Sequence, residues 1–290
     1  MPCRHPHDWP AELADLPARP ELHALAMPRQ WRGEIDDTLL ESARLPGLRL
    51  LRIYVPAAEL RGEAPLPVLL CNDGHKVFEA ANHATVPPWL QRGTLQLHRV
   101  MDGLLCMGAL RPAVVVAIGT HASSRADQYV PVRSQLGATS FGGGGDDYLD
   151  LLQHEALPAV QARLGAIRLS TAAADRILCG TSIGGVSALY GALTRPHVFG
   201  GAIALSPSAW IEDGFLVRVV QAASELPTRL AADIGAGERE PIRAHCHQLF
   251  QALAGRGGGR VFAEEVAGVH HEDSWRQRLP RLLQHVLGRG

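Results

Sequence analysis

The segment Cys179–Gly185, which reads CGTSIGG, places a serine hydroxyl between closely spaced glycines. Its residues Gly180–Gly184 match the pattern G-x-S-x-G, in which a serine occupies a strained turn between a strand and a helix. In such a turn the hydroxyl projects above the sheet, and the positions two before and two after the serine lie too close together for side chains. The segment follows a strand-like apolar run and opens a helix-like one, so the sequence predicts that Ser182 is a nucleophile.

A serine hydroxyl is a poor nucleophile at neutral pH and needs a general base, and that base needs an orienting acid. In proteins with this turn the chain order is serine, acid, histidine, so both partners should lie downstream of Ser182. Two polar clusters follow strand-like runs there, at residues 232–240 and 268–275. Their candidate side chains are Asp233, Glu238, Glu240, His270 and His271.

The elements that must position these residues follow from the pattern of apolar residues. Short continuous apolar runs are typical of strands buried on both faces, and a period of 3.6 residues indicates a helix. Alternation of the two indicates an α/β fold with a mostly parallel central sheet and helices on both faces. We predict strands over residues 48–56, 67–74, 113–119, 177–180, 201–207, 229–237 and 260–268, and helices over 146–164, 184–196, 241–257 and 275–287.

Length and composition indicate a protein with a large buried core. The chain has 290 residues, 46% of them apolar, and no repeat or linker. We therefore expect an irregular leader over residues 1–30, which are rich in proline and histidine, and a single domain over residues 31–290. A net charge of −1 gives no electrostatic reason to expect a nucleic acid or an anionic membrane surface as a partner.

Cellular location and cysteine chemistry are predicted from what the chain does not contain. No run of about 18 apolar residues and no apolar core of signal-peptide length occurs, so we expect no membrane span and a cytoplasmic location. The five cysteines are scattered, and none forms a C-x-x-C pair, so we expect reduced thiols. His245 and His247 would point about 200° apart on a helix, which argues against a metal site there.

Several motifs occur in the order found in a known family. Within residues 175–210, GTSIGG, RPHVFG and SPSAW match the family's GxSxGG, RPxxFG and SPSxW. NDGHKVF (72–78) is similar to its DGQNLF turn, RADQYVPVR (125–133) to its R-x-x-x-Y-x-P segment, and HHEDSWRQRLP (270–280) to its H-N-E-x-x-W-x-x-R. Over roughly residues 30–288 the chain thus resembles the "Putative esterase" family of α/β-hydrolases, which includes enterochelin esterases, feruloyl and acetyl-xylan esterases and S-formylglutathione hydrolase.

The resemblance implies roles for the nucleophile and the base. Ser182 matches the family nucleophile. His270 matches the family base, because it lies five residues before Trp275. His271 stands where the family usually has Asn, so it is the alternative to His270.

The acid is less narrowly implied. The family places a carboxylate in the loop after the strand predicted at 229–237, and Glu238 fits that place. Asp233 lies within the strand-like run and is the main alternative, and Glu240 is a third. The alternative for Glu238 is an exposed loop residue without a catalytic role, because ERE (238–240) also resembles an exposed charged run.

An oxyanion hole of two backbone N–H groups is expected. One belongs to Ile183, the residue after the nucleophile. The resemblance places the other at His75, where Gly74 permits close approach. His75 and Lys76 replace the family's Gln-Asn, which changes side chains at the pocket rim and leaves the N–H in place.

Four further residues are candidates for a substrate pocket. Trp210, Phe78 and Tyr129 would supply apolar walls, although each also suits core packing. Arg125 would contact a polar or anionic part of the substrate, or else pair with a structural acid.

These residues predict a serine hydrolase that cleaves a small-molecule carboxylic ester through an acyl-enzyme intermediate, with no metal or organic cofactor. An acyltransferase with the same triad, an enzyme for a thioester or a siderophore amide-ester, and a binding protein on a hydrolase fold that has lost its activity are the alternatives. The sequence does not predict which ester is cleaved or the oligomeric state.

Overall fold

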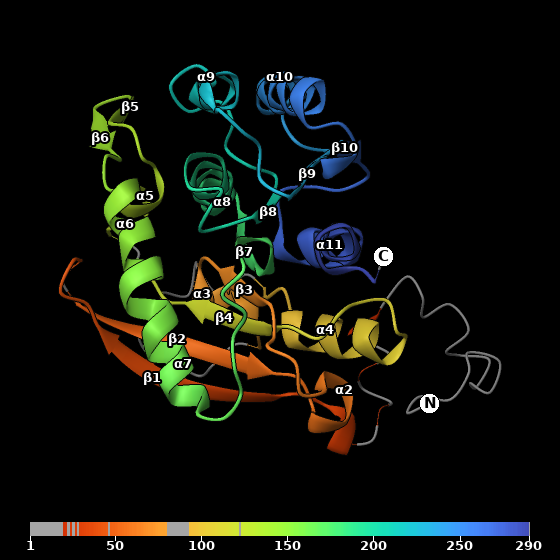
Figure 1. Ribbon diagram of the computed structural model, residues 1–290. Coiled ribbons are helices and arrows are strands. Elements are labelled where there is room, and N and C mark those ends of the chain that lie inside the picture. The colour runs from red at the N-terminus through yellow and green to blue at the C-terminus, as the bar shows by residue number, and fades with distance from the viewer. Residues whose placement is uncertain are drawn as a thin grey trace.

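The computed structural model describes residues 20, 21, 24, 27, 29–45, 47–79, 93–121 and 123–289, and most of the expected leader 1–30 lies outside the described residues. Its centre is an eight-stranded sheet with the order β1-β2-β4-β3-β7-β8-β9-β10 (Figure 1). The strands are β1 (Glu34–Glu41), β2 (Leu48–Val55), β3 (Val68–Cys71), β4 (Val114–Ile118), β7 (Arg176–Thr181), β8 (Gly201–Leu205), β9 (Arg229–Gly235) and β10 (Val261–Val266).

The sheet is mostly parallel, as the sequence predicts. Strand β2 pairs antiparallel with both β1 and β4, and every pairing from β4 to β10 is parallel. All seven predicted strands are present in this sheet, and β1 is its eighth strand. It lies at the edge of the sheet, where its residues alternate between half-buried and exposed, so it lacks the continuous apolar run of a central strand.

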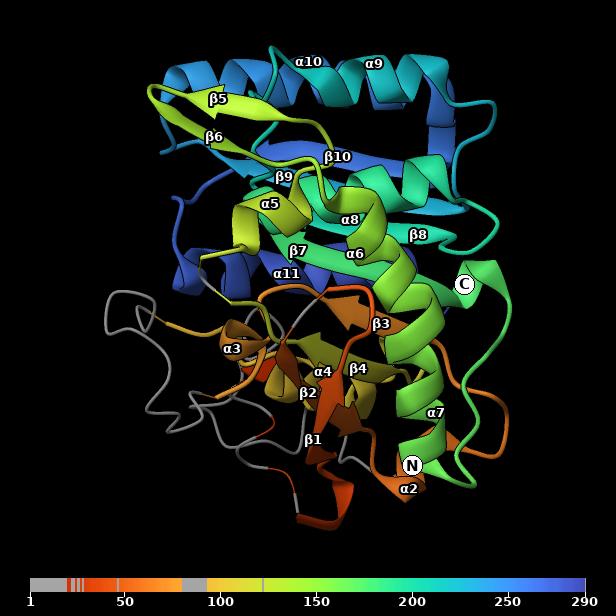
Figure 2. The ribbon, with the colours of Figure 1, turned by 90° about the vertical axis from the view of Figure 1, so that its left-hand side faces the viewer.

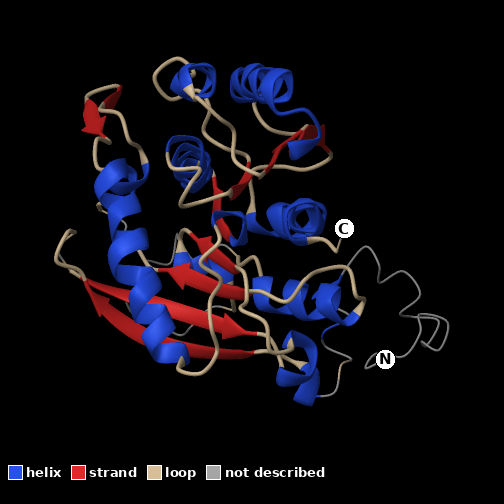
Figure 3. Ribbon diagram, viewed as in Figure 1, coloured by secondary structure: helices blue, strands red, loops and turns tan. Residues whose placement is uncertain are grey.

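Helices cover both faces of this sheet (Figure 3), and all four predicted helices are present. On one face lie α8, α9, α10 and the long run from α6 through a π-helical turn to α7, and on the other lie α4 and α11. These helices are α4 (Leu97–Cys106), α6 (Gly145–Leu151), η6 (Leu152–Ala156), α7 (Leu157–Leu164), α8 (Ile183–Thr194), α9 (Phe215–Ala222), α10 (Glu240–Gly257) and α11 (Glu272–Leu287).

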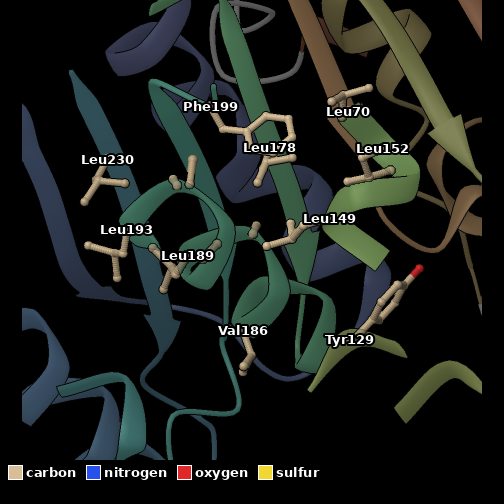
Figure 4. Close-up of a cluster of buried hydrophobic side chains, with 14 of the residues drawn as sticks. Leu70, Tyr129, Leu149, Leu152, Leu178, Val186, Leu189, Leu193, Phe199 and Leu230 are labelled. Carbon is tan, nitrogen blue, oxygen red and sulfur yellow. The ribbon is translucent and has the colours of Figure 1, made fainter. Parts of the chain in front are cut away.

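The central strands are apolar throughout because each face packs against helices. In β3, Val68 and Leu70 belong to the core beneath α8, whereas Leu69 and Cys71 belong to the core beneath α4 and α11. Figure 4 shows part of the first core, in which side chains from β7 and α8 meet those from α6. Burying one such leucine stabilises the fold by roughly 1.5–3 kcal/mol.

The remaining elements are short connections around the ends of the strands. Strands β5 and β6 form a separate hairpin next to α5, outside the main sheet (Figure 2). These elements are η4 (Arg29–Trp31), α2 (Ala58–Arg61), α3 (Gly74–Val77), α5 (Arg125–Tyr129), β5 (Ser134–Leu136), β6 (Thr139–Phe141), η7 (Ala173–Asp175) and η8 (Gly258–Arg260).

Two expectations from composition can be compared with the structure. Among the described residues, none of the helices combines the length and the hydropathy that a membrane span requires. Cys71, Cys179 and Cys246 carry free, buried thiols. Cys106 is disulfide-bonded, so the expectation of reduced thiols is wrong for this residue.

Candidate active site

The predicted nucleophile, acid and base follow three parallel strands of the same half of the sheet. Ser182 comes directly after β7, Glu238 three residues after β9, and His270 four residues after β10. Strands β7, β8, β9 and β10 are consecutive neighbours (Figure 2). Because the carboxyl ends of parallel strands meet at one edge of a sheet, the fold brings all three loops to that edge.

The turn at Ser182 has the strained geometry that the sequence predicts. Ser182 has φ 56° and ψ −125°, a backbone conformation that residues other than glycine rarely adopt. A Cβ atom on Gly180 would lie 2.2 Å from the carbonyl oxygen of Gly184, so glycine is required there. The Ser182 N–H donates to the carbonyl of Leu205 at 3.0 Å, which fastens the turn to the end of β8.

Glu238 and His270 are joined by a hydrogen bond. Glu238 Oε2 lies 2.7 Å from His270 Nδ1, with the carboxylate side chain 1% exposed and the imidazole 41% exposed. Burial alone would raise the pKa of Glu238, but hydrogen bonds from His270 and from Ser206 outweigh it and hold that pKa below its ordinary value. Glu238 is therefore ionised at neutral pH, and it orients the imidazole through Nδ1.

The other carboxylates of the two clusters have different partners. Asp233 is fully buried and lies 3.5 Å from Nη1 of Arg278. Burial raises the pKa of Asp233 to about 6, an effect that Arg278 offsets only in part. Glu240 is exposed and pairs with Arg243 at 3.0 Å. Of the three candidate acids, Glu238 is the one that contacts His270.

The two adjacent histidines are also distinguished by their contacts. His271 is the N-cap residue of α11, and its Nδ1 accepts the N–H of Asp273 at 3.2 Å. Its ring is thus committed to the start of a helix. His270 instead faces Glu238, with the edge of its ring against Trp275 at 4.8 Å between ring centroids.

The Ser182 hydroxyl lies 3.2 Å from Ser208 Oγ, and the two described residues Ser182 and His270 share no direct hydrogen bond. Backbone contacts nevertheless tie their loops together. The Ser208 N–H donates to the carbonyl of Ser182 at 3.2 Å, and the Ser206 N–H donates to the carbonyl of Asp233 at 2.8 Å. The loops after β7, β8 and β9 are thus linked one to the next.

The turn after β3 is fastened to the nucleophile turn. Asn72 Nδ2 donates to the carbonyl of Gly184 at 2.8 Å. A Cβ on Gly74 would lie 2.6 Å from the backbone of Ile118, so this glycine permits the close approach that the sequence predicts. Ile183 is the first residue of α8, and His75 is the second residue of the short helix α3 that follows β3. The oxyanion role of their N–H groups stays a prediction.

Two of the four candidate pocket residues are enclosed in the protein. Phe78 and Tyr129 are fully buried and pack in the core, the alternative that the sequence leaves open for each. Phe78 packs edge-on against His98, and the Tyr129 hydroxyl accepts the N–H of Asp73 at 2.8 Å. Aromatic residues suit both a core and a pocket wall, which is why sequence alone did not separate these roles.

The other two pocket candidates remain at least partly exposed. Arg125 makes a bidentate ion pair with Asp73, with both N···O distances 2.5 Å. This is the pairing with a structural acid that the sequence gives as the alternative to substrate contact. Burial alone would raise the pKa of Asp73, but the charge and hydrogen bonds of Arg125 outweigh it, so this pKa lies below its ordinary value. Trp210 is half-buried and packs at the margin of the core beneath α8.

Several polar residues near the site were not predicted. Ser206, Trp275 and Arg278 form a buried hydrogen-bonded group around Glu238. Lys76 Nζ lies 2.6 Å from Glu272 Oε1, which links the turn after β3 to the start of α11. The position of Ser206 in the SPSAW motif, directly after a strand, was the available signal.

Comparison with protein families identifies the chain. The model of the family described as "Putative esterase" matches residues 42–286. The chain belongs to this family. The resemblance carried by the sequence motifs is thereby confirmed.

Two proteins of similar sequence are named as esterases. The iron(III) enterobactin esterase of Escherichia coli strain K12 is 28% identical over 269 residues, which cover 90% of this chain and 56% of the E. coli protein. The siderophore triacetylfusarinine C esterase of Aspergillus fumigatus is 33% identical over 156 residues, which cover 51% of this chain and 46% of that protein. The chain thus spans about half the length of these relatives.

Solved structures of esterases share the fold. The crystal structure of the enterobactin esterase FES from Shigella flexneri, in the presence of 2,3-dihydroxy-N-benzoyl-serine, matches with a TM-score of 0.70 and 23% identity. The match covers 92% of this chain and 62% of that one. The predicted α/β-hydrolase fold is confirmed.

Proposed function

We propose that this protein is a carboxylic ester hydrolase in which Ser182, His270 and Glu238 form a catalytic triad. The observation that carries the proposal is the hydrogen bond of 2.7 Å between Glu238 and His270, whose loop lies at the same sheet edge as the strained turn of Ser182. Membership of the "Putative esterase" family supports the same chemistry.

The reaction begins at the serine. His270 Nδ1–H donates to Glu238, so Nε2 carries a lone pair and takes the proton of the Ser182 hydroxyl as Oγ attacks the ester carbonyl carbon. The C=O electron pair moves to oxygen, where the N–H groups of Ile183 and His75 stabilise the negative charge. Collapse of this intermediate breaks the C–O bond of the ester, and His270 gives its proton to the leaving alcohol.

Deacylation repeats these steps with water. His270 takes a proton from a water molecule as that water attacks the acyl carbon, and then returns the proton to Ser182 Oγ. Glu238 stabilises the imidazolium formed in each half-reaction and stays ionised throughout. Hydrogen bonds between nucleophile and base are often long in a free enzyme and tighten when the substrate binds, so the contact of Ser182 with Ser208 is compatible with this route.

The substrate class is taken from the names of the relatives. Two of them are named iron(III) enterobactin esterase and siderophore triacetylfusarinine C esterase. We propose a small-molecule ester as the substrate of this chain. A panel of p-nitrophenyl esters, a feruloyl ester and a 2,3-dihydroxybenzoyl-serine ester would rank the acyl groups by kcat/KM.

The proposal is tested with p-nitrophenyl esters of increasing acyl length on the wild type and on Ser182→Ala. We expect kcat to fall by at least about a thousandfold in the variant, as in other triad enzymes that lose the nucleophile. His270→Ala should cause a similar loss, and His271→Ala, the matched control, should stay within about threefold of wild type. Equal rates in wild type and Ser182→Ala would refute the assignment, and an added alcohol that appears in the product would indicate acyl transfer.

A further inference from the structure

Ser206 occupies a constrained position at the end of β8. Its side chain is fully buried, and its backbone has φ 47°, in the left-handed region that a serine rarely adopts. Backbone strain of this kind persists only where the surroundings hold it in place. The contacts of the Ser206 hydroxyl supply that hold.

The hydroxyl of Ser206 receives hydrogen bonds from two side chains of α11. Trp275 Nε1 lies 2.9 Å and Arg278 Nη2 lies 2.8 Å from Ser206 Oγ. These two residues are three positions apart, so they lie on the same face of the helix. Indole and guanidinium nitrogens can only donate, so together they occupy both lone pairs of the hydroxyl.

The hydroxyl proton therefore has one direction left. Ser206 Oγ lies 2.5 Å from Glu238 Oε1, and a carboxylate can only accept. Glu238 Oε1 also accepts the N–H of Gly235 at 3.1 Å, whereas Oε2 faces His270. One oxygen of the carboxylate is thus anchored, and the other is presented to the imidazole.

Arg278 is itself held in place by a buried carboxylate, that of Asp233. It is 4% exposed, and its Nη1 lies 3.5 Å from the buried carboxylate of Asp233, while its Nη2 lies 3.9 Å from Glu238 Oε1. Asp233 thus provides the counter-charge that keeps a buried guanidinium beside Ser206. This gives a role to the second buried acid of the site, which does not touch a histidine.

From these contacts we propose that Ser206 is a positioning residue for the reaction. Its hydroxyl, whose lone pairs are filled by Trp275 and Arg278, directs its only proton to Glu238 and so fixes the carboxylate that orients His270. The inference rests on the proposed function, because it assigns Ser206 to the triad. Helix α11 thus contributes to the active site through Trp275 and Arg278, which do not contact the reacting atoms themselves.

The test compares Ser206→Ala with Ser42→Ala. Ser42 Oγ also donates a 2.5 Å hydrogen bond to a glutamate, Glu155, and Ser42 is 7% exposed, but it lies outside the site. We expect Ser206→Ala to lower kcat for a p-nitrophenyl ester about ten- to a hundredfold with KM within about twofold. Ser42→Ala should leave both constants within about twofold of wild type.

A spectroscopic measurement separates positioning from a general loss of structure. The proton shared by His270 Nδ1 and Glu238 should give a downfield proton NMR signal, assigned by its loss in Glu238→Gln. We expect this signal to shift or broaden in Ser206→Ala and to stay unchanged in Ser42→Ala. Wild-type kcat and an unchanged signal in Ser206→Ala would overturn the inference.

A second variant keeps the test decisive if Ser206→Ala does not fold. Trp275→Phe removes one donor to Ser206 and keeps an aromatic ring beside His270. We expect kcat to fall about two- to tenfold with KM unchanged and the same NMR signal displaced, and no change in either would overturn the inference. Failure of the wild type to hydrolyse any ester or to react with a fluorophosphonate would instead refute the proposed function itself.

Discussion

The two halves of the candidate site are held by different kinds of contact. The nucleophile half, residues 176–194, depends on backbone geometry: the φ of 56° at Ser182 and the 2.2 Å approach that forbids a side chain on Gly180. The acid half, residues 229–238 and 261–278 together with Ser206, depends on hydrogen bonds between side chains. These join residues 32 positions apart, as for Glu238 and His270, or 72 apart, as for Ser206 and Arg278.

This difference predicts how each half responds to mutation. Backbone contacts fail when any side chain is added, whatever its chemistry, because carbonyl oxygens and main-chain carbons cannot move aside. Side-chain contacts fail when a donor or acceptor is changed, even if the volume is kept. The nucleophile half should therefore be sensitive to volume, and the acid half to hydrogen-bonding chemistry.

The largest expected effect is that of Glu238→Gln, which keeps the volume and changes the chemistry. An amide that donates to His270 Nδ1 would leave the hydrogen on Nε2, where the imidazole cannot accept the proton of Ser182. We expect kcat for a p-nitrophenyl ester to fall by roughly 10³–10⁴-fold, as when the triad carboxylate of other enzymes becomes an amide.

The control for this variant is Glu240→Gln, a nearby exposed carboxylate that should stay within about twofold of wild type. Near wild-type kcat in Glu238→Gln would show that Glu238 is not the acid. An equal loss in Asp233→Asn, with normal folding, would show that the two buried carboxylates act together.

The next effect is on stability and probes the nucleophile half. Gly180→Ala places a Cβ 2.2 Å from the carbonyl oxygen of Gly184, so the free energy of unfolding in urea should fall by at least about 2 kcal/mol. Gly255→Ala is the matched control, because it lies within α10 and a Cβ there meets nothing within 4 Å. It should raise the free energy of unfolding by about 0.5–1 kcal/mol. Equal stabilities of the two variants would contradict the account of the turn.

A smaller effect is expected where the two halves are joined to the turn after β3. Lys76 is paired at 2.6 Å with Glu272, whose side chain is 6% exposed. Lys76→Met keeps the apolar stem but removes the cation closest to a buried carboxylate at the start of α11, two residues after His270, and leaves that carboxylate only His271 at 3.9 Å. We expect kcat/KM to fall about tenfold, since the His270 loop loses its tie to the N–H of His75.

The double variant Lys76→Met/Glu272→Gln is the control for this pair. It also removes the charge of this carboxylate, so it should recover part of the lost kcat/KM relative to Lys76→Met alone. If the loss of kcat/KM in the double variant equals the product of the losses in Lys76→Met and Glu272→Gln alone, the ion pair does not couple the two segments.

The smallest effect concerns a carboxylate outside both halves. Asp102 in α4 accepts hydrogen bonds from Tyr54 OH at 2.7 Å and the N–H of Gly33 at 2.8 Å. Burial raises the pKa of Asp102 to about 6, although both hydrogen bonds and Arg32 oppose the rise. Between the unfolded pKa near 3.8 and this value, the folded state binds more protons, so the free energy of unfolding falls as pH rises.

Asp102→Asn keeps the acceptor for Tyr54 and removes this titration. Urea unfolding near pH 4 and near pH 7.5 should show the free energy of unfolding of the variant rising by up to about 2 kcal/mol relative to that of the wild type between the two conditions. Tyr54→Phe, which removes the hydroxyl and keeps Asp102, should retain the wild-type direction of the pH dependence. Parallel pH curves for wild type and Asp102→Asn would contradict a raised pKa in the folded state.

The fold was predictable because its central strands are buried on both faces. That burial produces the continuous apolar runs of β3, β4, β7 and β8, which the sequence shows directly. Strand β1 was not predicted, because it lies at the edge of the sheet and its sequence mixes polar and apolar residues instead of forming a continuous apolar run. Helix α4 was not predicted because its apolar face contains Asp102, a buried charge whose partners are 48 and 69 residues away.

The nucleophile half was predictable and the acid half only in part, for a related reason. Ser182 and its glycines form one short segment, so their constraint is written in consecutive residues. The choice between Glu238 and Asp233 depends on which carboxylate reaches an imidazole in a distant loop. Phe78 likewise packs against Tyr54 of β2 and His98 of α4, which lie about 20 residues away on either side. Contacts over such separations follow from the fold and not from any local pattern.

Reaction with a fluorophosphonate, followed by peptide mass spectrometry, tests the central claim most directly. We predict one adduct, on the Ser182 hydroxyl, formed by the wild type, lost in Ser182→Ala and formed far more slowly in Glu238→Gln. Ester hydrolysis by a wild-type protein that carries no adduct on Ser182, or carries it on another residue, would contradict the account.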